Sequence, residues 1–130
     1  MAKRKLRPRP KVNGWVYLLK IWVNGEVVYK IGTTNRTPTV RMLEIAGELN
    51  QLLGHIPKMM LLQSKQTMNN YQVESAVLKA TEKYKYRIQC TGSFSGESEI
   101  RKMCVAELLT EYNKCLLVDY PAIQRFKVEI

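Results

Sequence analysis

Four side chains of this sequence have the types that phosphodiester hydrolysis requires: Tyr17, Lys30, Arg41 and Glu74. The reaction needs an activated water and neutralisation of the charge that develops around phosphorus. The only acid within residues 49–81 is the glutamate, and one such carboxylate can suffice to hold Mg²⁺ with water and phosphate oxygens. The arginine can bind a phosphate oxygen through its planar, permanently charged guanidinium. The tyrosine could accept a proton from water if a nearby cation such as the lysine stabilised its phenolate.

A predicted β-hairpin places the tyrosine and the lysine on neighbouring strands. Residues 14–23 and 26–32 are rich in β-branched and aromatic side chains, and Asn24-Gly25 separates them. An Asn-Gly pair between two such segments is a strong hairpin signal, because both turn positions require positive φ. We therefore expect the two side chains to lie close together on paired strands.

A helix and a third strand are predicted to follow. Thr37 can cap the helix and Pro38 suits its first position, while Gly54 is typical of a residue that ends one. Arg41 then lies in or near the first turn. Residues 56–63 predict an edge strand, since an early proline disfavours a central one.

Two further helices complete the predicted order. One spans about residues 71–86, with Glu74 near its start, and the other runs from Ser95 or Ser98 to about residue 113. Cys104 lies on the apolar side of this last helix and is expected in the core. The order β-β-α-β-α-α predicts a small α+β fold, with a three-stranded antiparallel or mixed sheet flanked by helices.

The ordered set of motifs resembles the GIY-YIG nuclease family over roughly residues 14–100. The resemblance rests on Gly14-Trp15-Val16-Tyr17, Lys30-Ile31-Gly32, Arg41 and Glu74. Lys30 stands where the family usually has its second tyrosine, as in a branch common among phage and small predicted nucleases. The resemblance implies a DNA endonuclease that uses Mg²⁺ or Mn²⁺, with Tyr17 as general base, Lys30 and Arg41 as catalytic residues and Glu74 as metal ligand.

Several neighbouring residues are candidates for supporting roles. Arg36 competes with Arg41 for the phosphate, and spacing assigns it instead to the DNA backbone. Tyr29 and Gly32 adjoin the second motif and are accessory candidates. His55 is either a loop histidine or an accessory acid or phosphate contact.

The segment Ser95-Gly96-Glu97-Ser98-Glu99 supplies two more carboxylates. One interpretation makes them the acidic start of a helix, where they favour the macrodipole. The alternative makes them a second metal ligand or a gate on the site.

Length and charge indicate one domain with a basic arm. The chain has 130 residues, of which 45% are hydrophobic and 25% charged, with a net charge of +10. This composition predicts a single globular domain over residues 13–130 after a flexible arm over residues 1–12. The arm has no acid, so we expect it to bind DNA through its six basic residues, which are Lys3, Arg4, Lys5, Arg7, Arg9 and Lys11.

The remaining features favour a cytoplasmic protein. No apolar run is long enough for a membrane helix or a signal peptide. Three cysteines without close pairing fit a reducing compartment, and a bacterial or phage-infected cell is the expected setting. The domain has no room for a separate recognition module, so specificity would come from the arm, DNA shape, a second copy or a partner protein.

Two rival hypotheses remain open at this point. The same fold could be catalytically inactive and bind nucleic acid through its basic surface, since fold alone does not determine function. Alternatively, the chain could be a small RNA-associated structural protein in which the motif match is accidental. Glu74→Gln separates an enzyme from both, because only an enzyme would lose an activity while keeping its DNA binding.

Overall fold

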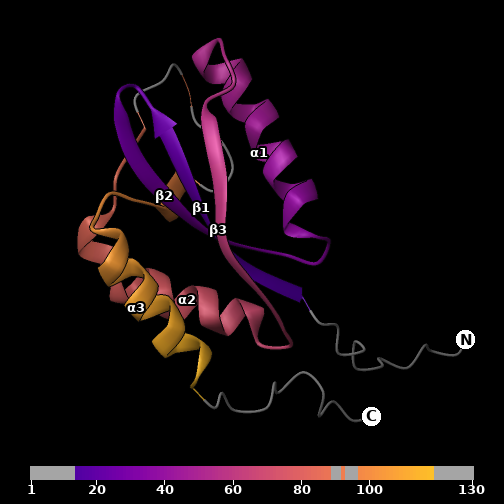
Figure 1. The fold of residues 1–130 in the computed structure, drawn as a ribbon, viewed down its shortest axis with the longest axis vertical. Helices are drawn as coiled ribbons and strands as arrows, with labels where there is room; N and C mark the ends of the chain where they lie inside the picture. Colours follow the sequence, from indigo (N-terminus) through magenta and orange to yellow (C-terminus); the bar gives the residue numbers. More distant parts are fainter. Residues whose placement is uncertain (1–13, 89–91, 93–96, 119–130) are drawn as a thin grey trace, which may run out of the picture.

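The computed structural model describes residues 14–88, 92 and 97–118, and Figure 1 shows its architecture. The elements are, in order, β1 (Gly14–Val23), β2 (Glu26–Thr34), α1 (Pro38–Leu53), β3 (Lys58–Thr67), α2 (Asn70–Ala80), the 3₁₀ turns η1 (Glu82–Tyr84) and η2 (Glu97–Glu99), β4 (Ile100–Arg101) and α3 (Val105–Leu116). The predicted α+β class is confirmed. The predicted arm over residues 1–12 lies outside the described residues.

The predicted hairpin between β1 and β2 is confirmed. Asn24 and Gly25 both have positive φ, of 53° and 76°, as a two-residue turn between twisted strands requires. The antiparallel register pairs Tyr17 with Gly32 and Leu19 with Lys30. Because paired residues point to the same face of a sheet, the tyrosine, the glycine and the lysine share one face.

The sheet is antiparallel throughout, with the strand order β3-β1-β2-β4. Its two faces are covered by different helices, as Figure 1 shows: α1 on one side, and α2 with α3 on the other. The tyrosine face of β1 packs against Ile45 and Leu49 of α1. The opposite face packs against Val73 of α2 and Leu108 of α3. Strand β1 is therefore almost completely buried. Packing on both of its faces fixes the backbone that carries Tyr17.

Helix α1 begins and ends where the sequence predicts. Pro38 is its first residue, and Gly54 closes it with a φ of 84° and an N–H bond to the Asn50 carbonyl. The Thr37 hydroxyl makes no capping hydrogen bond, so the predicted position of the cap is right but its predicted chemistry is wrong.

Strand β3 lies at the edge of the sheet, as predicted, but its predicted bounds of 56–63 are wrong. It spans Lys58–Thr67 and pairs along the whole of β1. Its second half is polar and exposed, so it carries no hydrophobic signal, yet its backbone completes the ladder. Its last residue, Thr67, pairs with Gly14.

The two C-terminal helices differ most from expectation. Helix α2 ends at Ala80 rather than near residue 86, because the backbone leaves the helical conformation at Thr81 and continues as the 3₁₀ turn η1. Helix α3 begins at Val105 rather than at Ser95 or Ser98.

A fourth strand occupies part of the segment predicted as helix. In β4, Ile100 pairs with Lys30 of β2 and packs in the core beside α1. Two residues are too few to show a strand periodicity, and Ile100 fitted a helical spacing with Leu108. Cys104 precedes α3 and is exposed, so its predicted place in the core is wrong.

None of the helices among the described residues is long and apolar enough to cross a membrane.

Candidate functional site

Tyr17 stands at the centre of the candidate site on strand β1. Its side chain is fully buried, and its hydroxyl has no partner with hydrogen-bond geometry among the described residues. A buried hydroxyl left in this state costs about 1–3 kcal/mol. Such groups are rare in folded proteins, and a catalytic role is one explanation for them, so this oxygen is the first candidate for chemistry.

Gly32 provides the space that the Tyr17 phenol occupies. A Cβ at position 32 would lie 2.4 Å from the Tyr17 hydroxyl oxygen and 2.9 Å from Lys30 Nζ. The glycine is thus required by a close approach rather than by backbone conformation. Because Gly32 has no side chain, the Tyr17 phenol and the Lys30 ammonium can lie next to each other at this position.

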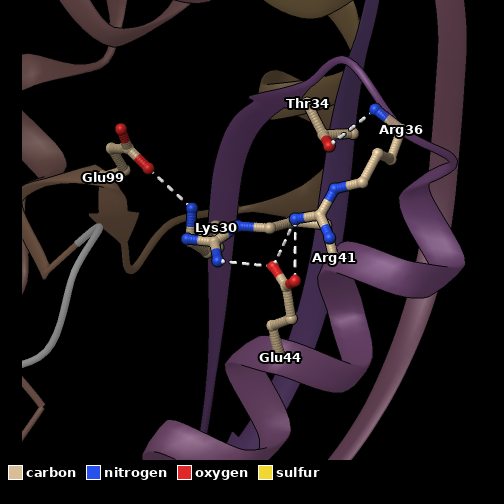
Figure 2. Close-up of polar contacts among 6 residues, drawn as sticks. All are labelled: Lys30, Thr34, Arg36, Arg41, Glu44 and Glu99. Carbon is tan, nitrogen blue, oxygen red and sulfur yellow. Dashed lines mark hydrogen bonds and ion pairs between the residues drawn. The ribbon is translucent and has the colours of Figure 1, made fainter.

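Lys30 is buried on β2 and paired with an acid from a distant part of the chain. Its exposed fraction is 1%, and its Nζ donates to Glu99 Oε1 at 2.6 Å (Figure 2). The same ammonium lies 5.5 Å from the centre of the Tyr17 ring. A positive charge is therefore fixed beside the phenol, as the sequence analysis proposed.

Glu74 lies in the second turn of α2 and interacts with Glu99 and Lys30. Burial, followed by the charge of Glu99 and a hydrogen bond with it, raises the pKa of Glu74 to about 7, although Lys30 opposes this. Glu74 thus lies close to both Glu99 and Lys30, and its carboxyl group retains a proton up to about neutral pH.

The start of α2 is anchored to β1 by Asn70. This residue is buried, and its side-chain amide lies 3.5 Å from the Trp15 carbonyl oxygen. A Cβ at Gly14 would come within 2.2 Å of the Asn70 amide nitrogen. The glycine of the first motif therefore lets α2 approach the strand, and so helps to fix the position of Glu74.

Arg41 lies in the first turn of α1 and is largely shielded from solvent. Its guanidinium donates to Glu44 Oε1 at 3.1 Å. Burial lowers the pKa of Arg41, but the bond to Glu44 and the interaction with the Tyr17 oxygen raise it by more. Arg41 thus lies near the phenol and retains its positive charge.

Arg36 binds the same carboxylate from the loop before α1. Its guanidinium lies 2.7 Å from Glu44 Oε2, and its side chain is 58% exposed. Figure 2 shows Glu44 between the two arginines. The more exposed Arg36 is free to turn toward a ligand outside, whereas Arg41 is the arginine directed at the tyrosine.

Two of the accessory candidates lie away from the site. Tyr29 is buried on the opposite face of the sheet, in the core formed with α2 and α3. Its neighbours on β2 face the other way because side chains alternate along a strand. His55 is exposed beyond the end of α1, and about 18 Å of helix at 1.5 Å per residue separate Arg41 from the last helical residue before it. The loop interpretation of His55 agrees with this position, and the structure brings neither residue to the site. The six basic residues of the predicted arm lie outside the described residues.

The acidic segment before β4 does not begin an α-helix. Glu97 and Glu99 belong to the turn η2, where Glu97 pairs with Arg87 at 3.1 Å and Glu99 enters the site. Glu44 and the pairing of Glu99 with Lys30 were not predicted. The contact of Glu44 with Arg41 had a local signal, because the two residues are three positions apart on a helix. The second joins residues 69 apart in sequence, for which no local signal exists.

One carboxylate of the site is available to bind a cation. Among the described residues, no group of three or more histidine, cysteine, aspartate or glutamate side chains could hold a metal ion. Mg²⁺ nevertheless needs only one or two protein carboxylates. Glu99 is committed to Lys30, so Glu74 is the side chain whose donor chemistry fits such an ion.

Residues 14–116 of the chain match the T5orf172 domain. Searches of curated proteins and of solved structures gave no significant match. The matched range includes all the residues of the site described above.

Proposed function

Because the chain belongs to the T5orf172 domain family, and because of the site that it carries, we propose that it is a DNA endonuclease of the GIY-YIG type. In this proposal it hydrolyses phosphodiester bonds with the help of Mg²⁺ or Mn²⁺. The single observation that carries the proposal is the buried Tyr17 hydroxyl, which has no hydrogen-bond partner among the described residues. It stands among the cations Lys30 and Arg41, with Glu74 nearby.

The roles follow from the position of each group. Tyr17 accepts the proton of the attacking water, and Lys30, fixed beside the ring at 5.5 Å, stabilises the phenolate that results. Arg41 binds a non-bridging phosphate oxygen and stabilises the charge that develops in the transition state. Glu44 aligns its guanidinium until the phosphate arrives.

Glu74 would hold the metal ion, which when bound supplies positive charge to the phosphate and to the departing oxygen. The carboxyl group must lose its proton first, and its pKa of about 7 means that this happens near neutral pH. Lys30, which is only 1% exposed, is itself shielded from water at this position.

DNA binding is assigned to charge around the site. Arg36 is exposed next to the arginine that binds the phosphate, and the basic residues at positions 3–11 add a polyanion-binding segment. Contacts of this kind bind the backbone and carry no base specificity.

The proposal is tested by incubating the protein with supercoiled plasmid and Mg²⁺ or Mn²⁺. Wild type should nick the plasmid, while Glu74→Gln and wild type in EDTA should not. Glu111→Gln is the matched control, because this half-buried glutamate lies on α3 and pairs with Lys114 at 3.6 Å rather than with a residue of the site. It should nick like wild type, and gel shifts should show that all three proteins bind DNA. No nicking by wild type despite DNA binding would instead support the inactive nucleic-acid-binding protein.

A further inference from the structure

Glu99 is the acid of the site that neither the roles above nor the family match assigns. It lies in the turn η2, which leads directly into β4. Its Oε1 accepts from Lys30 Nζ at 2.6 Å, and its side chain is 24% exposed. A buried ammonium is costly unless an anion pairs with it, so the placement of the Lys30 side chain depends on Glu99.

The position of Glu99 is fixed from both sides. The next residue, Ile100, is fully buried and pairs with Lys30 across the sheet. Arg101 is also buried, and its guanidinium donates to the Ser98 carbonyl at 2.9 Å and to the Leu78 carbonyl at 3.2 Å. The backbone on each side of Glu99 is thereby anchored to β2 and to α2.

The ammonium that Glu99 binds points at the phenol of Tyr17. Lys30 Nζ and the Tyr17 hydroxyl oxygen both lie within 3 Å of the point where a Cβ of residue 32 would stand. Glu99 also faces Glu74, the metal ligand of the proposed function. Glu99 therefore interacts both with the lysine beside the proton-accepting group and with the residue that would hold the metal ion.

We propose that Glu99 is a positioning residue, which holds the Lys30 ammonium in place beside the Tyr17 hydroxyl for the cleavage step. This inference rests on the proposed nuclease function. It assigns Glu99 no contact with the DNA or with the metal ion, and it distinguishes Glu99 from Glu97, which pairs with Arg87 at the surface.

The test measures single-turnover cleavage of a DNA duplex, DNA affinity and the Mg²⁺ concentration that gives half the maximal rate. Glu99→Gln should slow cleavage about 10- to 100-fold, as expected when a catalytic group is misplaced. DNA affinity should stay as in wild type, and the Mg²⁺ requirement should not rise, because the substitution only removes a charge that raises the pKa of Glu74. Glu97→Gln is the matched control and should cleave at the wild-type rate.

A second pair of variants covers the case in which Glu99→Gln does not fold because Lys30 loses its anion. Lys30→Met and the double variant Lys30→Met/Glu99→Gln both lack the buried ammonium. If Glu99 positions only Lys30, the two should cleave at equal rates when Mg²⁺ is saturating.

Three results would overturn the inference while leaving the nuclease function intact. They are wild-type cleavage by Glu99→Gln, a double variant clearly slower than Lys30→Met, and an increased Mg²⁺ requirement, which would make Glu99 a second metal ligand. Absence of cleavage by wild type itself would instead remove the proposed function, and the positioning role with it.

Discussion

Two buried polar side chains of the site differ in how their polar atoms are satisfied. Lys30 has an anion at 2.6 Å, whereas the Tyr17 hydroxyl has no hydrogen-bond partner among the described residues. A fold optimised only for stability would pair or replace such a hydroxyl, because its desolvation is not compensated. The folded state is therefore less stable because of the hydroxyl to which we assign proton transfer.

Glu74 also lowers the stability of the folded protein, by an amount that depends on pH. Its pKa is raised to about 7 in the folded protein, from an ordinary value of 4.5. The folded state thus binds more protons than the unfolded state between these values, and stability falls as pH rises from about 4.5 to about 7. Without metal, the urea midpoint of wild type should fall across this window, and that of Glu74→Gln should fall less. Parallel curves for the two proteins would contradict the raised pKa.

At the level of elements, the short segment from η2 to β4 ties the two sides of the site together. Arg101 is 1% exposed and joins α2 to β4 through Thr81 Oγ1 at 3.0 Å and the Leu78 carbonyl. These bonds occupy acceptors where α2 ends and hold Glu99 in its place. A strand of two residues is stable here because a buried side chain anchors it.

Removal of Arg101 should therefore be costly. Arg101→Met leaves buried carbonyl and hydroxyl acceptors without a donor, and we expect the free energy of unfolding to fall by about 2–4 kcal/mol. Urea denaturation followed by circular dichroism measures this loss. Lys102→Met, which removes an ion pair with Glu26 and a contact of the exposed ammonium with the Tyr86 ring, is the control and should change stability little. Equal midpoints for the two variants would show that Arg101 does not anchor the segment.

Elements with a strong local signal could be predicted from the sequence, and elements that depend on distant partners could not. Asn24-Gly25 and Gly54 require positive φ, so the hairpin and the end of α1 follow from residue chemistry alone. In contrast, Ile100 fits a helix by spacing and becomes a strand residue only because β2 offers an edge. The residues of β3 after Gln63 are polar, and only pairing with β1 makes them a strand.

In the candidate site, too, some residues could be predicted from local motifs, whereas others depend on distant contacts. Tyr17, Lys30, Arg41 and Glu74 were predicted as a set, and the structure brings them together. Tyr29 was misplaced because adjacency to a motif says nothing about the face of a strand. The role of Glu99 depends on a contact across 69 residues.

At the scale of the whole molecule, the charge is unevenly distributed. The net charge is +10, and residues 1–12 contribute six basic residues and no acid, leaving +4 for the rest. Around the site, by contrast, the described arginines and lysine are paired with Glu44 and Glu99. We therefore assign most of the affinity for a polyanion to the N-terminal segment and the chemistry to the domain.

Deletion of residues 2–12 tests this division of roles. The truncated protein should bind duplex DNA more weakly, and its log affinity should depend less steeply on log salt, by up to about 5 for six lost phosphate contacts. Fluorescence anisotropy over a salt series measures both. Single-turnover cleavage at saturating protein should change little. An unchanged salt slope would place the DNA-binding charge elsewhere.

The most direct test of the central claim compares Tyr17→Phe with wild type in cleavage and in stability. The substitution removes one oxygen that has no hydrogen-bond partner among the described residues, so the free energy of unfolding should stay within about 1 kcal/mol of wild type or rise. Cleavage should fall at least about 100-fold, as expected for loss of a general base. A Tyr17→Phe protein that is equally stable and cleaves at the wild-type rate would contradict the account, because the buried hydroxyl would then have no part in the reaction.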